Sequence, residues 1–135
     1  MKAELQKQIF DKCPILYRNR HLGPQQNLMC FGIECGSGWF DLILELSVEI
    51  EMIAQRMKTE GVDESLLPYA FQIKEKYGGL NVSVHNEYKE FSHLIEAAEA
   101  QSGRVCEECG KPGILRRNDG WFSTLCDECQ QKTSP

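Results

Sequence analysis

Four cysteines near the C-terminus constrain this chain more than any other feature. Cys106 and Cys109 form one C-x2-C pair, and Cys126 and Cys129 form a second pair after a gap of 16 residues, 110–125. This is the spacing of a tetrahedral four-cysteine zinc site, because each pair sits on one tight turn and the gap lets both turns converge on one metal. Four thiolates fill the coordination shell of zinc and leave no position for water or substrate. The predicted site is therefore structural and not catalytic.

The length of 135 residues fits one domain with a small appendage, and the 41% apolar content is enough to bury a core. We expect an α+β body over residues 1–103 and a zinc module over residues 104–135. The chain has no apolar run long enough for a membrane span, and its first residues lack the apolar core of a signal peptide. Seven cysteines, of which four fit a metal site, suit a reducing compartment. These observations predict a cytoplasmic protein.

The charge of the chain argues against one class of partner. The formal net charge is -5, and four thiolates with one Zn²⁺ change it by -4 + 2, which gives -7. A protein that binds nucleic acid by neutralising phosphates needs clustered cations. The dense basic spots are only Arg18–Arg20 and Arg116–Arg117, so binding to nucleic acid by bulk charge is disfavoured.

Hydrophobic periodicity predicts the elements of the body. A wide apolar arc over residues 38–60 indicates a central helix that is packed on more than one side, with Trp39 as a core anchor. Further segments with helical or strand periodicity are helices over 3–12 and 87–102, a strand over 28–34, and a hairpin over 70–85. Together they predict an α+β fold with a small antiparallel sheet and packed helices.

Local signals predict where the helices begin and end. Ser37 is the expected N-cap of the central helix and Gly61 the residue just beyond its end. Asn86 is the expected N-cap of the helix over 87–102, and Asp63 is expected to cap a short turn that ends before Pro68.

The zinc module reads as a hairpin followed by a short helix. Residues 114–117 and 121–124 are the expected strands, and Asn118-Asp119-Gly120 is the turn between them. Cys126–Cys129 would open the last helical turn. This describes a treble-clef or ribbon-like module, which is too small to fold alone and needs metal ligation worth on the order of 10 kcal/mol.

The module resembles the zinc finger of the DksA/TraR family of bacterial RNA polymerase regulators. The resemblance rests on Cys106, Cys109, Gly110, Arg116, Arg117, Thr124, Leu125, Cys126 and Cys129. In that family a long antiparallel coiled coil enters the polymerase. Here the long helix is followed by a hairpin and not by a partner helix. The resemblance therefore implies the finger and not the activity.

A second resemblance spans residues 30–130. Its segments are E-C-G-x-G-W-F-x-L-I at 34–43, Q-x-K-E-K-Y-G-x-L at 72–80, I-E-A-A-E-A at 95–100 and C-x-x-C-G-x-P-G at 106–113. These segments are similar to small zinc-ribbon proteins of tailed phages and prophages whose function is unknown. The resemblance implies a bacterial or phage setting and supplies no activity.

Three further cysteines have competing interpretations. Cys13, Cys30 and Cys35 could form a second metal site with His21, but their spacing is unusual for zinc, and free cysteine is commonly a small buried apolar residue. Cys35 precedes the central helix, where a thiol can have a lowered pKa and be reactive. No base is placed beside it by sequence, so we expect packing roles for all three.

The finger also carries a possible partner contact made of Arg116, Arg117 and Trp121. This basic and aromatic face suits phosphate contact and base stacking, or the docking of a protein. The sequence pattern indicates neither a nucleophile–base pair nor an open metal site, so we expect no enzymatic activity. The sequence predicts a non-catalytic zinc-binding interaction protein that acts through a protein partner. The alternative is a nucleic-acid-binding or transcription-associated regulator that uses the finger.

Overall fold

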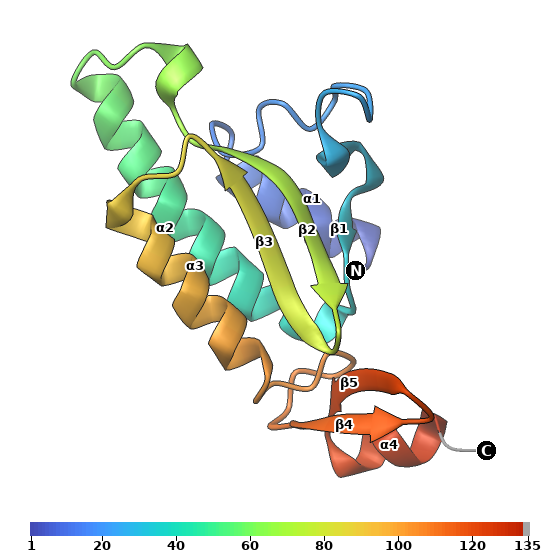
Figure 1. Cartoon of the computed structure of the whole chain (residues 1–135). Coiled ribbons are helices and arrows are strands. Elements are labelled where there is room, and N and C mark those ends of the chain that lie inside the picture. The colour runs from blue at the N-terminus through green and yellow to red at the C-terminus, as the bar shows by residue number, and fades with distance from the viewer. Residues whose placement is uncertain (134–135) are drawn as a thin grey trace.

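The segments with helical and strand periodicity form an α+β structure, which Figure 1 shows as a computed structural model describing residues 1–133. In chain order the elements are α1 (Ala3–Lys12), η1 (Leu28–Phe31), β1 (Ile33–Glu34), η2 (Ser37–Trp39), α2 (Phe40–Thr59), η3 (Glu64–Leu66), β2 (Tyr69–Lys76), β3 (Gly79–His85), α3 (Lys89–Ser102), β4 (Ile114–Asn118), β5 (Trp121–Leu125) and α4 (Asp127–Thr133); the η elements are 3-10 turns. The predicted α+β class is confirmed. Ser134 and Pro135 of the predicted zinc module lie outside the described residues.

The body contains a three-stranded sheet with the strand order β1-β2-β3. The predicted hairpin over 70–85 forms its antiparallel part, in which Ile73 lies opposite Val82. β1 pairs with β2 in parallel, with Ile33 opposite Ile73, so the sheet is mixed where an antiparallel sheet was expected. A strand as short as β1 cannot be distinguished from a loop by alternation alone.

The predicted strand over 28–34 is wrong for most of its length. The side chain of Asn27 accepts a 2.7 Å hydrogen bond from the backbone N–H of Met29 and so starts the turn η1. Gly32 then adopts a left-handed φ of 77°, which ends the turn and leaves only Ile33–Glu34 as a strand. Met29 is buried while Phe31 is 60% exposed, so the two side chains do not share one face.

α2 and α3 lie side by side along β3 (Figure 1). The apolar face of residues 38–60 packs into the core as predicted, and Trp39 is fully buried. The main core cluster consists of Ile9, Cys13, Leu16, Tyr17, Met29, Ile33, Cys35, Trp39, Ile43, Leu46, Ile50, Ala70, Ile73, Leu80, Val84, Phe91, Ile95 and Ala98.

In the described part of the chain, no helix has both the length and the apolar character needed to cross a membrane.

The end of α2 follows the sequence signal. Gly61 has a left-handed φ of 88°, its N–H donates to the carbonyl of Lys58, and the N–H of Val62 donates to the carbonyl of Met57. This is a Schellman motif, in which a glycine beyond the last turn satisfies the final carbonyls of the helix. Asp63 caps η3 as predicted, because its carboxylate accepts the N–H of Ser65.

Two predicted N-caps are wrong. The hydroxyl of Ser37 accepts a 3.0 Å hydrogen bond from the backbone N–H of Lys2, so it binds the N-terminal segment and not the start of α2. The side-chain amide of Asn86 donates to the carbonyls of Ser65 and Leu67 and so ties the end of β3 to η3. In both cases a bond to a distant segment replaces the local cap.

α3 protects the outer edge of β3. The hydroxyl of Ser102 accepts the N–H of Leu80, and the carboxylate of Glu99 accepts the N–H of Val82, both at 2.9 Å. Unpaired N–H groups on an edge strand invite pairing with another chain. Side chains of α3 satisfy these two donors, so this edge is a poor template for adding a strand.

Candidate metal centre

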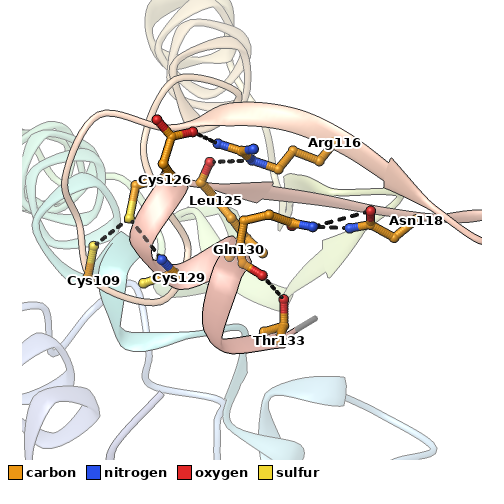
Figure 2. A network of polar contacts seen from close by, with 9 residues as sticks. Cys109, Arg116, Asn118, Leu125, Cys126, Cys129, Gln130 and Thr133 are labelled. Carbon is orange, nitrogen blue, oxygen red and sulfur yellow. Dashed lines mark hydrogen bonds and ion pairs between the residues drawn. The ribbon is translucent and has the colours of Figure 1, made fainter. Parts of the chain in front are cut away.

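The four predicted cysteines are brought together by three elements. Cys106 and Cys109 lie on the turn after α3, Cys126 follows β5, and Cys129 lies in α4. Their sulfur atoms all lie within 4.8 Å of one another, and those of Cys109 and Cys126 are 3.6 Å apart (Figure 2). A tetrahedral zinc site with Zn–S bonds of about 2.3 Å has its sulfurs about 3.8 Å apart. The cluster can therefore hold a metal ion, and its donor set is the one typical of zinc.

A tight hairpin makes this convergence possible. β4 and β5 are antiparallel, with Asn118 opposite Trp121, and are joined by Asp119 and Gly120, which both have left-handed φ values, of 51° and 87°. Such two-residue turns favour Asp-Gly and match the twist of the strands. The predicted hairpin is thus confirmed. The order of cysteine turn, hairpin and short helix is that of the treble-clef alternative.

The cysteine turn is fixed to the hairpin by backbone hydrogen bonds. The N–H of Glu107 donates to the carbonyl of Thr124 on β5 at 2.9 Å, while the N–H of Gly110 donates to the carbonyl of Cys106 at 2.9 Å and closes the cysteine turn itself. An isolated bridge between Val105 and Pro112 closes the loop behind the turn. These bonds place the first cysteine pair against the second pair.

Cys106 and Cys129 differ in their tendency to ionise. Burial opposes ionisation of Cys106, but the backbone N–H groups around its sulfur outweigh that effect and lower its pKa to about 7. Burial and the neighbouring thiols raise the pKa of Cys129 to about 12. Sulfurs this close cannot all become thiolates unless a cation neutralises them. The cluster therefore has the chemistry of a cation site.

Arg116 makes a structural contact within the finger. Its Nε donates to the carbonyl of Leu125 at 3.0 Å, and its guanidinium binds the carboxylate of Asp127 at 2.7 Å (Figure 2). The side chain is only 19% exposed. Arg116 therefore joins the hairpin to the start of α4, beside Cys126. Its contact with a partner stays a prediction.

Arg117 and Trp121 remain at the surface. Neighbouring residues of a strand point to opposite faces, so Arg117 lies on the face opposite Arg116. Its guanidinium carbon lies 5.8 Å from the ring centroid of Phe122. Trp121 is 80% exposed. Whether these two residues contact a partner stays a prediction.

The remaining cysteines do not join in a second cluster. Among residues 1–133, Cys106, Cys109, Cys126 and Cys129 form the one group of three or more potential ligands close enough to hold a metal. Cys13 and Cys35 are buried in the main core, while Cys30 is exposed.

The prediction of packing roles thus holds for Cys13 and Cys35. Burial raises the pKa of the Cys35 thiol to about 12, and the Glu107 carboxylate adds to the rise. The position before α2 therefore does not make Cys35 a reactive thiol.

The finger is joined to the body through Glu107, which sequence reasoning missed. Its backbone carbonyl accepts the N–H of Gly38 at 2.7 Å, and its carboxylate accepts the N–H of Gly36 at 2.8 Å. A Cβ at Gly38 would lie 2.1 Å from the carbonyl oxygen of Cys106. The Gly36-Ser37-Gly38 turn therefore lets the cysteine turn approach the start of α2. In the sequence, the two glycines are the only sign of this close approach.

A second junction lies at the tip of the β2–β3 hairpin. The hydroxyl of Thr124 donates to the carbonyl of Gly78 at 2.7 Å. A Cβ at Gly78 would lie 2.6 Å from the side chain of Leu115 and 3.0 Å from the backbone nitrogen of Ser123. Gly78 thus allows the two hairpins to touch.

Comparisons with protein-family models, with curated proteins and with solved structures find no match to this chain. The structure supports one part of these resemblances, namely a C-terminal cluster of four cysteines suited to a zinc finger.

Proposed function

We propose that this chain is a non-catalytic zinc-binding interaction protein that acts through a protein partner. The observation that carries the proposal is the closed cluster of four cysteine sulfurs within 4.8 Å of one another. Four thiolates on one metal complete a tetrahedral shell and hold a small module together. The metal would stabilise the finger and would not activate a substrate.

The donor set favours zinc over other metals. Soft thiolate ligands in a tetrahedral arrangement select zinc or an iron–sulfur centre, whereas magnesium and calcium need oxygen ligands. The two C-x2-C pairs on tight turns are the arrangement of structural zinc modules. Cys106, Cys109, Cys126 and Cys129 would hold the metal.

The charge distribution supports a protein partner more than nucleic acid. The chain has a net charge of -5, and Arg116 is already bound to Asp127. Little positive charge is left on the finger for phosphate contacts, which govern the affinity of nucleic-acid-binding proteins. The resemblance to phage proteins supports the cytoplasm of a bacterial host as the setting.

Metal analysis of the freshly purified protein tests the proposal. We expect about one zinc and no iron per chain, and a colourless solution. Cys126→Ser should lose the metal, whereas Cys30→Ser, which changes an exposed cysteine outside the cluster, should retain it. Less than half an equivalent of zinc in the wild-type protein would contradict the proposal.

A further inference from the structure

The tips of the two hairpins enclose a groove where the finger meets the body. The tip of the β2–β3 hairpin lies next to β5 (Figure 1). Between them is a groove of about 380 Å³ lined by Glu75, Lys76, Tyr77, Gly120, Trp121 and Phe122. We call these six residues the aromatic end. Four other grooves of the described chain have at most one aromatic side chain in their lining.

The aromatic side chains here are unusually exposed. Tyr77 is 76% exposed and Trp121 is 80% exposed, and Phe122 is also at the surface. Clustered exposed apolar side chains mark interaction sites, and Trp and Tyr are the residues most enriched among those that dominate binding energy. Neither Tyr77 nor Trp121 belongs to the buried core clusters. Their presence is therefore not explained by the stability of the monomer.

The backbone conformation of Tyr77 is a second, independent indication that its side chain has a function. Its φ is 52°, in the left-handed region, at a turn position where Asn, Asp and Gly are preferred. A bulky residue there is strained, and such strain is kept where the side chain serves a function. Since the Tyr77 ring is mostly in solvent, that function lies in what it contacts outside the chain.

The charges around the groove are balanced. Lys76 lies 5.7 Å from the ring centroid of Tyr77, and Arg117 lies against Phe122 on the adjoining strand. Glu75 and Asp119 provide two negative charges at the same tips. Two cations and two anions leave this end neutral although the whole chain carries -5. A surface that holds both signs can match its own copy after a two-fold rotation.

We propose that a second copy of this chain docks at the aromatic end and forms a two-fold symmetric dimer. Trp121 lines the groove and is mostly exposed, so the ring of each copy can reach the groove of the other. Lys76 and Arg117 of each copy then meet Glu75 and Asp119 of its mate. A polyanion such as single-stranded nucleic acid fits a neutral groove less well. The inference rests on the proposed function because the β4–β5 hairpin belongs to the metal-held finger.

Sedimentation equilibrium of the zinc-loaded chain tests the dimer. Between about 1 and 200 µM the wild-type protein should pass from monomer to dimer, within the range of specific but modest affinities. Trp121→Ala should raise the dimer dissociation constant at least about tenfold, as loss of a central interface aromatic does. Phe31→Ala, which removes another exposed aromatic side chain, in η1 and outside the groove, should leave that constant unchanged.

A second variant separates docking from folding. Tyr77→Asn should raise the melting temperature, because Asn-Gly is favoured in this turn, and yet weaken the dimer at least about tenfold. Zinc content is measured in every sample. A wild-type protein that carries one zinc and stays monomeric would overturn the inference alone, as would a dimer indifferent to both variants. A wild-type protein that purifies without zinc would overturn the proposed function.

Discussion

The indole nitrogen of Trp39 donates a 2.8 Å hydrogen bond to the backbone carbonyl of Val105. Trp39 precedes α2 and is fully buried, while Val105 leads directly into the metal cluster. A residue that sequence periodicity assigns to the core of the body thus also anchors the finger. The stability of the two parts should be coupled through this bond.

Trp39→Phe should destabilise the protein by at least about 1–2 kcal/mol, because the partly buried carbonyl of Val105 loses its donor and the smaller phenyl ring fills the site of the buried indole only in part. Trp39→Ala should cost about 3–5 kcal/mol, since it also leaves a cavity. Urea unfolding followed by circular dichroism measures both. Trp121→Phe, measured at a concentration low enough to keep the chain monomeric, is the matched control, because that indole is mostly exposed and its loss should be close to neutral for the monomer. Equal midpoints for Trp39→Phe and the wild type would contradict the coupling.

Two glycines with almost the same backbone allow the contact between the hairpins to be measured. Gly78 and Gly120 have φ values of 86° and 87°, and each is the second residue of a two-residue turn. A Cβ at Gly120 would meet nothing within 4 Å, whereas one at Gly78 would meet Leu115 at 2.6 Å.

Gly120→Ala should therefore cost about 1 kcal/mol, the penalty of a left-handed alanine. Gly78→Ala should cost about 1–3 kcal/mol more than Gly120→Ala, because its methyl group overpacks the junction. Denaturant titration of both variants gives the difference. If the two substitutions cost the same, the contact between the hairpins contributes nothing to stability.

The parts of the fold that sequence patterns predicted are those governed by local chemistry. The central helix has a long apolar arc and a glycine beyond its end, and the finger hairpin has Asp-Gly at its turn. The metal cluster follows from cysteine spacing, since four thiolates at two tight turns have few other uses. Each of these signals lies within one segment of the chain.

The parts that failed depend on partners far away in the sequence. Ser37 and Asn86 have the chemistry of N-caps, but their side chains bind segments that are distant along the chain. The bond from Arg116 to Asp127 was likewise not predicted from the sequence. The role of Glu107 depends on a turn 71 residues earlier. No local pattern carries this information, because each of these bonds forms only when separate segments of the chain pack together.

Removal of the metal should unfold the finger while the body persists. The large core cluster contains residues of α1, α2, α3 and the sheet, while Cys106, Cys126 and Cys129 lie in a separate small cluster. Chelation should therefore preserve most of the far-UV helical signal, because the finger contributes only α4. In Trp121→Phe, the remaining Trp39 should shift its emission as its bond to Val105 loosens. Complete loss of helical signal would contradict a boundary between residues 103 and 104.

The buried thiols should make stability depend on pH in the alkaline range. Burial raises the pKa of Cys13 and of Cys35 to about 12 from an ordinary value of 9.0. Above pH 9 the unfolded chain loses these protons and the folded chain keeps them, so the free energy of unfolding should fall as pH rises toward 12.

Alkylation followed by mass spectrometry gives a direct reading of the same shift. In the folded, metal-loaded protein, iodoacetamide should modify the exposed Cys30 and spare Cys13 and Cys35. Modification of Cys35 before Cys30 at neutral pH would show that the thiol near α2 is activated and not suppressed.

Duplex DNA should not bind tightly to this protein. The finger carries Arg104, Lys111, Arg116, Arg117 and Lys132 against five acidic residues, so it is neutral before the thiolates and the metal are counted. Arg116 is bound to Asp127, and Lys111 lies 3.5 Å from Glu128. Each phosphate contact depends on an unpaired cation, and salt weakens binding that rests on few such contacts.

We therefore expect affinity for random-sequence duplex DNA weaker than micromolar at about 0.15 M salt, where the Debye length is about 8 Å. A gel-shift titration measures it. Asp127→Asn is an informative variant, because it releases Arg116 and removes one negative charge, and it should strengthen whatever residual binding exists. Submicromolar affinity of the wild-type chain at that salt would favour a transcription-associated role over the protein-interaction role, since it would show that local geometry outweighs an unfavourable net charge.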